Sequence, residues 1–173
     1  ARQIVEALED AGIPDGVINL VTGPGSQVGS TLSSHPDIDV VSFTGSSSVG
    51  ERVYETASGD QKRVQCEMGG KNPTLVMPSA DLDQAAEIVK NGAFGVTGQA
   101  CTACSRAIVH EDVYDEFLER IVAEAESIEI GPGLDDPDMG PHVSESELEG
   151  TLEYIEIAKE DGATLEVGGG RPE

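Results

Sequence analysis

Short apolar runs alternate along the chain with longer segments of helical periodicity. We expect strands at 17–21, 39–43, 63–67, 74–77, 106–110 and 164–167, and helices at 1–11, 26–34, 46–57, 82–92, 113–128 and 145–160. Strands that follow one another through helices pair in parallel, because a parallel crossover needs the length of a helix. The pattern therefore predicts an α/β fold with largely parallel strand pairing.

A change of domain is expected where the pair Gly69-Gly70 separates two apolar runs. This division places residues 1–68 in one domain and residues 69–173 in the next. The chain starts in a helical pattern and ends directly after a strand-like run. We therefore expect it to be an internal piece of a longer protein.

Acidic residues outnumber basic residues by 33 to 10, which gives a formal net charge of −23. The acids are spread among regularly spaced apolar residues, a pattern that a disordered acidic segment would lack. We expect a folded protein with an acidic surface, as in organisms whose salt-rich cytoplasm screens such repulsion. The chain has no basic patch that could neutralise phosphates, so nucleic acid is not an expected partner.

The three cysteines are an odd number, which argues against the disulfide framework of a small secreted domain. No apolar run in the sequence is long enough to span a bilayer, so membrane association is not expected. A cytoplasmic location is the resulting prediction.

A glycine turn follows the expected strand at 39–43 and leads into a helix. Gly45 permits the turn, Ser46 offers a hydroxyl, and Gly50 allows close packing one helical turn later. The N-terminus of a helix suits a phosphate group, because its first N–H groups have no partner within the helix. The alternative is that Ser46 merely caps the helix. Gly25 follows the expected strand at 17–21 and either borders a cofactor pocket or makes an ordinary turn.

Cys101 lies in a glycine-flanked loop just before the expected strand at 106–110. A thiol in that setting can be an exposed nucleophile, provided that its pKa is lowered or a base is nearby. Two alternatives are a Cys101/Cys104 redox dithiol and half of a metal site. No histidine stands at ligand spacing, so we expect no metal. Cys66, within a strand, is most simply a small apolar core residue.

Glu67 stands at the end of the strand at 63–67, beside two glycines that give little steric cover. A carboxylate there can act as a general base on a water molecule if one water separates it from the Cys101 thiol. Taken singly, a glutamate at a strand end is more often solvated or paired with a cation.

Three motifs occur together in order and register. They are Thr44-Gly45-Ser46 with Gly50, then Glu67-Met68-Gly69-Gly70-Lys71, then Gly98-Gln99-x-Cys101-x-Ala103-x-x-Arg106. In order and spacing they resemble the aldehyde dehydrogenase superfamily, and the resemblance covers essentially the whole chain. It corresponds to about the middle third of a family chain. The sequence from Glu67 to Pro73 is similar to the matching segment of the subgroup that oxidises 2-oxoglutarate semialdehyde.

The resemblance implies NAD(P)-dependent oxidation of a small aldehyde. Cys101 would attack the carbonyl carbon to form a thiohemiacetal, and loss of hydride would leave a thioester. Glu67 would activate the water that hydrolyses this thioester. Two further hypotheses remain open, a non-catalytic nucleotide-binding module and a Cys-x-x-Cys redox or metal protein.

The resemblance also implies a cofactor site for NAD or NADP. The residues assigned to it are Gly25, Gly45, Ser46, Val49, Gly50, Met68 and Gly69. Residues 1–68 would be the second half of a Rossmann-like domain, and residues 69–173 the first part of an α/β catalytic domain. The full-length protein would be a homodimer or homotetramer, and the piece alone would have no turnover.

The sequence departs from the family pattern at three places. Cys104 stands where glycine or serine is commoner, which adds an oxidisable thiol next to the nucleophile. Glu147 and Gly150 stand where the family often offers Gln and Lys to the cofactor ribose. Val96-Thr97 replaces part of a more usual aromatic-Asn stretch.

Overall fold

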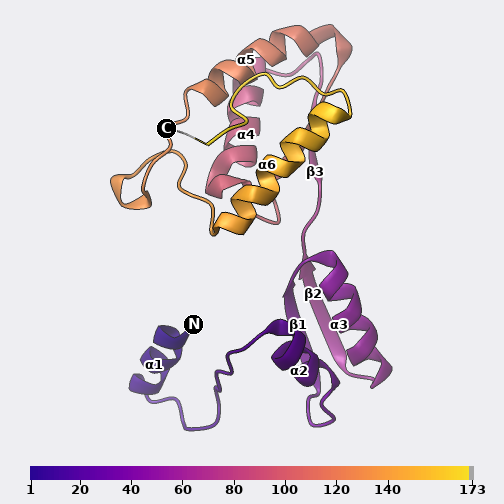
Figure 1. Cartoon of the computed structure of the whole chain (residues 1–173), viewed down its shortest axis with the longest axis vertical. Helices are drawn as coiled ribbons and strands as arrows, with labels where there is room; N and C mark the ends of the chain where they lie inside the picture. Colours follow the sequence, from indigo (N-terminus) through magenta and orange to yellow (C-terminus); the bar gives the residue numbers. More distant parts are fainter. Residues whose placement is uncertain (172–173) are drawn as a thin grey trace. The chain divides into compact units, whose positions relative to one another are not determined.

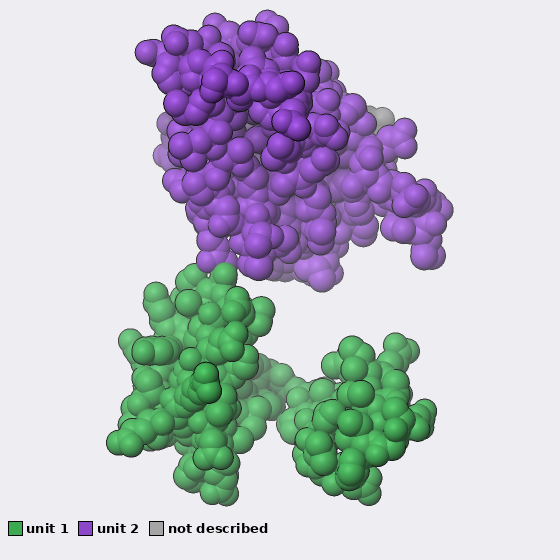
Figure 2. All heavy atoms as spheres, turned by 180° about the vertical axis from the view of Figure 1, so that it is seen from behind, with its two compact units in different colours: residues 1–68 green, residues 69–173 purple. Residues whose placement is uncertain are grey.

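The computed structural model describes residues 1–171. The chain divides into two compact units, Ala1–Met68 and Gly69–Glu173, which Figure 2 shows in different colours. Each unit contains a two-stranded parallel sheet with helices packed on it (Figure 1). The predicted α/β class with parallel pairing is confirmed.

The first unit builds its sheet from one β-α-β crossover. Its elements are α1 (Arg2–Asp10), a π-helical turn (Gly25–Gly29), α2 (Ser30–Ser34), β1 (Val40–Gly45), α3 (Ser47–Gly59) and β2 (Arg63–Met68). β1 and β2 pair in parallel from Val40 beside Arg63 to Gly45 beside Met68. α3 packs on both strands through its buried residues Gly50 and Ala57. Because parallel strands end at the same edge, Gly45 and Met68 come together there.

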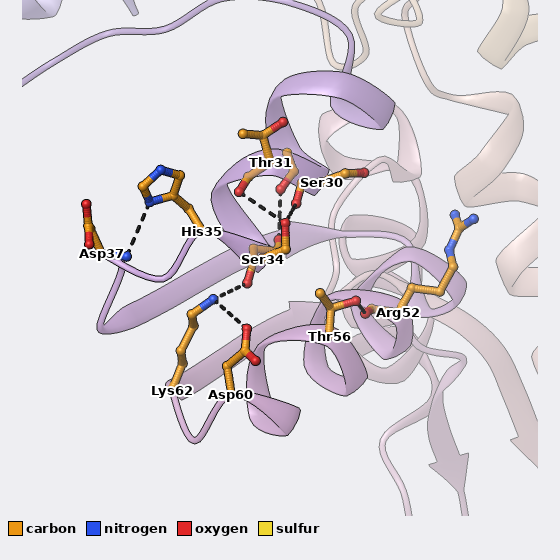
Figure 3. Close-up of polar contacts among 11 residues, drawn as sticks. Ser30, Thr31, Ser34, His35, Asp37, Arg52, Thr56, Asp60 and Lys62 are labelled. Carbon is orange, nitrogen blue, oxygen red and sulfur yellow. Dashed lines mark hydrogen bonds and ion pairs between the residues drawn. The ribbon is translucent and has the colours of Figure 1, made fainter.

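Lys62 fastens α2 to the start of β2 (Figure 3). Its side chain is 4 % exposed, and Nζ lies 3.2 Å from a carboxylate oxygen of Asp60. The same amino group donates to the main-chain carbonyl of Ser33 at 2.7 Å. A buried ammonium group needs such partners, because losing water would otherwise be costly.

The second unit repeats the alternation of strands and helices. Its elements are β3 (Asn72–Val76), α4 (Leu82–Phe94), a 3₁₀ turn (Gly95–Gly98), β4 (Cys104–Val109), a 3₁₀ turn (Glu111–Val113), α5 (Tyr114–Glu126), a 3₁₀ turn (Gly133–Asp135) and α6 (Glu145–Glu160). Val76, Ala86, Val89 and Phe117 form the buried core between the sheet, α4 and α5. Asp81 caps α4 by accepting from two N–H groups of the first turn.

Two expected strands, at 17–21 and 164–167, are wrong. Both segments are irregular in the structure, and Val17 and Val21 are 65 % and 62 % exposed. Within the described part of the chain, neither segment has a neighbouring strand to accept its backbone hydrogen bonds. An apolar run with strand propensity forms a strand only when it has such a ladder partner.

All three cysteines are free thiols. Among residues 1–171, no helix has both the length and the apolar composition needed to cross a membrane.

Candidate active site and cofactor site

The segment expected to bind phosphate has the predicted strand-turn-helix geometry. β1 ends at Gly45, Ser46 occupies the N-cap with extended backbone angles, and α3 begins at Ser47. Among the described residues, the Ser46 hydroxyl accepts no hydrogen bond from the first turn of α3; instead its oxygen lies 3.4 Å from the Ser48 hydroxyl. Ser46 thus occupies the cap position of α3, as the alternative has it, but without a side-chain hydrogen bond to the helix. The hydroxyl and the positive end of α3 face the same turn.

The two glycines of this motif stand where a side chain would collide with neighbours. A Cβ on Gly45 would lie 2.5 Å from the ring of Phe43, and one on Gly50 would lie 2.5 Å from the sulfur of Met68. The structure thus brings Gly45, Ser46, Gly50 and Met68 together at one edge of the first sheet. A backbone without side chains at a helix N-terminus fits the close approach of a dinucleotide pyrophosphate.

The remaining cofactor candidates are Val49 and Gly25 in the first unit and Gly69 in the second. Val49 is in the first turn of α3 and is partly exposed. Gly25 starts the π-helical turn that continues into α2, which packs against α3. Gly69 begins the second unit and is exposed.

Glu67 lies on β2, where it pairs with Thr44 of β1. Its side chain is exposed, and one carboxylate oxygen accepts a hydrogen bond from the Gln65 amide at 3.2 Å. Gln65 and Glu67 share one face of the strand because they are two residues apart. The carboxylate is therefore accessible to water.

Cys101 lies in the connection between the 3₁₀ turn Gly95–Gly98 and β4, and it is exposed. A hydrogen bond from the Ala103 N–H to the Ala100 carbonyl, at 3.0 Å, closes a turn around it. The side-chain amide of Asn72 contacts this turn, donating to the carbonyl of Cys101 itself at 2.8 Å. The thiol is therefore presented to solvent on a hydrogen-bonded turn.

Cys104 occupies a different environment from Cys101. It is half-buried at the start of β4 and packs against the core of the second unit. Its sulfur lies 3.2 Å from the Thr74 hydroxyl. Among residues 1–171, no group of three or more His, Cys, Asp or Glu side chains is arranged to hold a metal ion. These surroundings favour a packing role for Cys104.

Sequence reasoning gave no role to Asn72 or Thr97, although both lie within quoted or neighbouring segments. Thr97 anchors the Cys101 loop through the carbonyls of Gly140 and Pro141, at 3.3 and 3.4 Å. The signal that could have indicated Asn72 is its place before Pro73, because a residue before proline is held extended.

Comparison with known proteins decides the family. The sequence profile described as the aldehyde dehydrogenase family matches residues 1–173. The chain belongs to the aldehyde dehydrogenase family. Among curated relatives, it is 64 % identical over 171 residues to an alpha-ketoglutarate semialdehyde dehydrogenase of Haloferax volcanii, covering 99 % of this chain and 35 % of the relative. It is 48 % identical to a 2,5-dioxopentanoate dehydrogenase of Saccharolobus solfataricus, covering 96 % and 35 %.

Solved structures of aldehyde dehydrogenases agree with this membership. A betaine aldehyde dehydrogenase of Staphylococcus aureus in complex with NAD+ has a TM-score of 0.94 and 37 % identity, covering 99 % of this chain and 34 % of that one. A 1-pyrroline-5-carboxylate dehydrogenase from Thermus with bound NAD has a TM-score of 0.92 and 41 % identity, again covering 99 % and 34 %. The chain spans about a third of the length of the relatives it matches.

Proposed function

We propose that this chain is part of an enzyme that oxidises an aldehyde to a carboxylic acid with NAD or NADP. The observation that carries the proposal is the 64 % identity, over nearly the whole chain, to a semialdehyde dehydrogenase. The exposed thiol of Cys101 on its closed turn supports it, because a thiolate must reach a substrate carbon. Residues 1–68 contribute to the dinucleotide-binding domain, and residues 69–173 to the catalytic domain.

Two side chains of the chain carry the covalent steps. The Cys101 thiolate forms a bond to the aldehyde carbon and gives a thiohemiacetal. A nicotinamide dinucleotide at this site would supply the hydride acceptor. Loss of hydride from the thiohemiacetal carbon leaves a thioester on the Cys101 sulfur. Glu67 takes a proton from water as the water oxygen bonds to the thioester carbon. The carbon-sulfur bond then breaks, which releases the carboxylic acid and regenerates the thiolate.

The cofactor is held by backbone and small side chains in this proposal. Gly45, Ser46 and Gly50 at the start of α3 would hold the pyrophosphate, and Val49 and Gly25 would border the adenosine half. Met68 and Gly69 would contribute to the nicotinamide end of the site. Two aldehyde dehydrogenases of known structure contain NAD, which supports a nicotinamide dinucleotide here.

The proposed substrate is 2-oxoglutarate semialdehyde, also called 2,5-dioxopentanoate. Two relatives carry names for this activity, at 64 % and 48 % identity. The strongly acidic composition fits a salt-adapted enzyme. A cytoplasmic homo-oligomer remains a prediction.

Cysteine variants of the complete protein test the proposal. With 2,5-dioxopentanoate and NAD or NADP, we expect Cys101→Ser to lower kcat by about a thousandfold or more, because a hydroxyl at neutral pH is a poor nucleophile. The matched variant Cys104→Ser should stay within a few-fold of the wild type, at about 0.3–1 of its kcat. Equal losses from both would favour a dithiol instead. An unmodified protein that never forms a thioester on Cys101 would refute the mechanism.

A further inference from the structure

The side chain of Asn72 donates two hydrogen bonds to the turn that presents Cys101. The Nδ2 atom of Asn72 lies 2.8 Å from the carbonyl oxygen of Cys101 and 3.1 Å from that of Ala103. A primary amide has two N–H donors, so each carbonyl receives its own hydrogen bond. The opposite orientation of the amide would place an oxygen against two carbonyl oxygens. The contact therefore requires an amide nitrogen at this position.

The pairing of β3 with β4 changes register next to Asn72. In the β3–β4 register, Asn72 pairs with Cys104 but Pro73 pairs with Arg106, so Ser105 is the extra residue. A bulge bends its strand and re-aims the side chains next to it. Pro73 has no N–H to lose at the irregular position. Asn72 therefore stands at the irregular end of the β3–β4 pairing, where its side chain contacts the turn that presents Cys101.

The segment of the loop before Cys101 is held in a strained backbone conformation. Val96 and Thr97 have φ angles of 53° and 59°, in the left-handed region that β-branched residues avoid. The Thr97 hydroxyl reaches the carbonyls of Gly140 and Pro141, and the Gln99 side-chain oxygen accepts from the Val143 N–H at 3.1 Å. Strain of this kind persists only where surrounding contacts over-determine the backbone. The segment before Cys101 is therefore fixed by these contacts, and the position of the segment after Cys101 depends on Asn72.

We propose that Asn72 is a positioning residue for the Cys101 nucleophile. Its two hydrogen bonds fix the carbonyls on either side of Thr102. Because a fixed carbonyl of Cys101 also fixes the ψ angle of that residue, it sets the direction in which the thiol side chain points. This inference rests on the proposed function, because it assigns Asn72 to the reaction of that thiol. A displacement of about 1 Å at a reacting atom can cost about a hundredfold in rate.

Substitutions at Asn72 in the complete protein test the assignment. Asn72→Ala removes both donors, and Asn72→Ser keeps one shorter donor as the conservative variant. For Asn72→Ala we expect kcat to fall about 10- to 100-fold while KM for the cofactor changes less than about twofold. Amide hydrogen exchange in the peptide 98–104 should accelerate by about fivefold or more, since the turn loses its anchor. Asn72→Ser should recover part of both.

The matched control is Asn91→Ala, which removes the same amide from an exposed position on α4. It should leave kcat and exchange in 98–104 unchanged. The proposal is overturned if Asn72→Ala behaves like this control. It is also overturned if amide exchange accelerates throughout the second unit, kcat falls and cofactor KM rises together, and Asn72→Ser recovers neither. Should Asn72→Ala fail to accumulate, Asn72→Ser against wild type decides by the same two readouts.

The proposed function and the positioning role of Asn72 can be refuted independently of each other. If the unmodified protein shows no oxidation that depends on Cys101, the proposed function is refuted, whereas the exchange measurement still reports whether Asn72 holds the turn. If that oxidation is present and Asn72 variants retain it, only the positioning role is refuted.

Discussion

Gly50 of α3 packs directly against the sulfur of Met68 at the end of β2, so closely that a Cβ on Gly50 would lie 2.5 Å from it. Phe43 closes the same space, with a ring carbon 3.2 Å from that Cβ. The distance between α3 and the sheet edge is therefore set by the absence of one methyl group.

Gly50→Ala should move Met68 and weaken cofactor binding. We expect a loss of stability of about 1–3 kcal/mol from overpacking, together with a raised KM for the cofactor. Urea unfolding and steady-state kinetics of the complete protein measure the two effects. Gly59→Ala on the same helix is the control, because a Cβ there meets nothing within 4 Å. Equal behaviour of the two variants would contradict the close contact.

Glu67→Gln should separate acylation from hydrolysis. The amide oxygen can still accept from Gln65, so the local hydrogen bond survives. Loss of the base should slow hydrolysis by about 10²- to 10⁴-fold, which leaves the thioester to accumulate. Intact mass spectrometry after mixing with aldehyde and cofactor detects the acyl adduct. The exposed Glu55→Gln on α3 should turn over normally, and a Glu67→Gln enzyme without accumulated adduct would count against the assigned base.

Lys90 of α4 should stabilise the second unit in a pH-dependent manner. Its amino group lies 2.5 Å from Glu124 of α5, and this hydrogen bond raises the pKa of Lys90 above its usual value. A lysine whose pKa is higher in the folded state adds stability that is complete below the unfolded pKa of about 10.4. That stability is lost as the pH rises through the folded pKa.

Thermal unfolding between pH 8 and pH 11 measures this effect. Lys90→Met should lower Tm at pH 8, and the difference from wild type should shrink above about pH 10.4. A difference that stays constant with pH would indicate packing of the lysine chain rather than its charge.

Phe117→Ala should be the most damaging single truncation in the second core. Phe117 is 3 % exposed and packs with Val76, Ala86 and Val89. Removing a buried ring leaves a cavity and costs about 3–5 kcal/mol. Leu134, which is fully exposed in a loop, should tolerate the change to Ala within about 0.5 kcal/mol. Denaturant midpoints of the two variants test the contrast.

Helices and their caps were readable from the sequence because their signals are local. The helix expected at 145–160 coincides with α6, and the helix expected at 82–92 begins at the same residue as α4, which Asp81 caps. A capping residue and a 3.6-residue period depend only on neighbours within one or two turns. The family motifs were readable for a related reason, since their order and spacing lie along the chain.

The parallel direction of pairing was predictable, but which apolar runs find a strand partner, and in which register, was not. The runs at 17–21 and 164–167 have strand composition but no ladder partner among the described residues. Asn72 likewise stands at a register shift between strands whose paired residues are about 30 positions apart. Residue patterns do not encode which residue is skipped in such a register.

In the part of the chain that the structure describes, each sheet consists of two strands, and so each has two open edges of backbone donors and acceptors. Unpaired edges invite other strands to add to them, and two-stranded sheets are marginal on their own. A polypeptide limited to these residues would accordingly be expected to form inclusion bodies or mixed aggregates on expression. Co-expression with the parts of a relative that this chain does not span should recover it in solution if those parts supply the neighbouring strands.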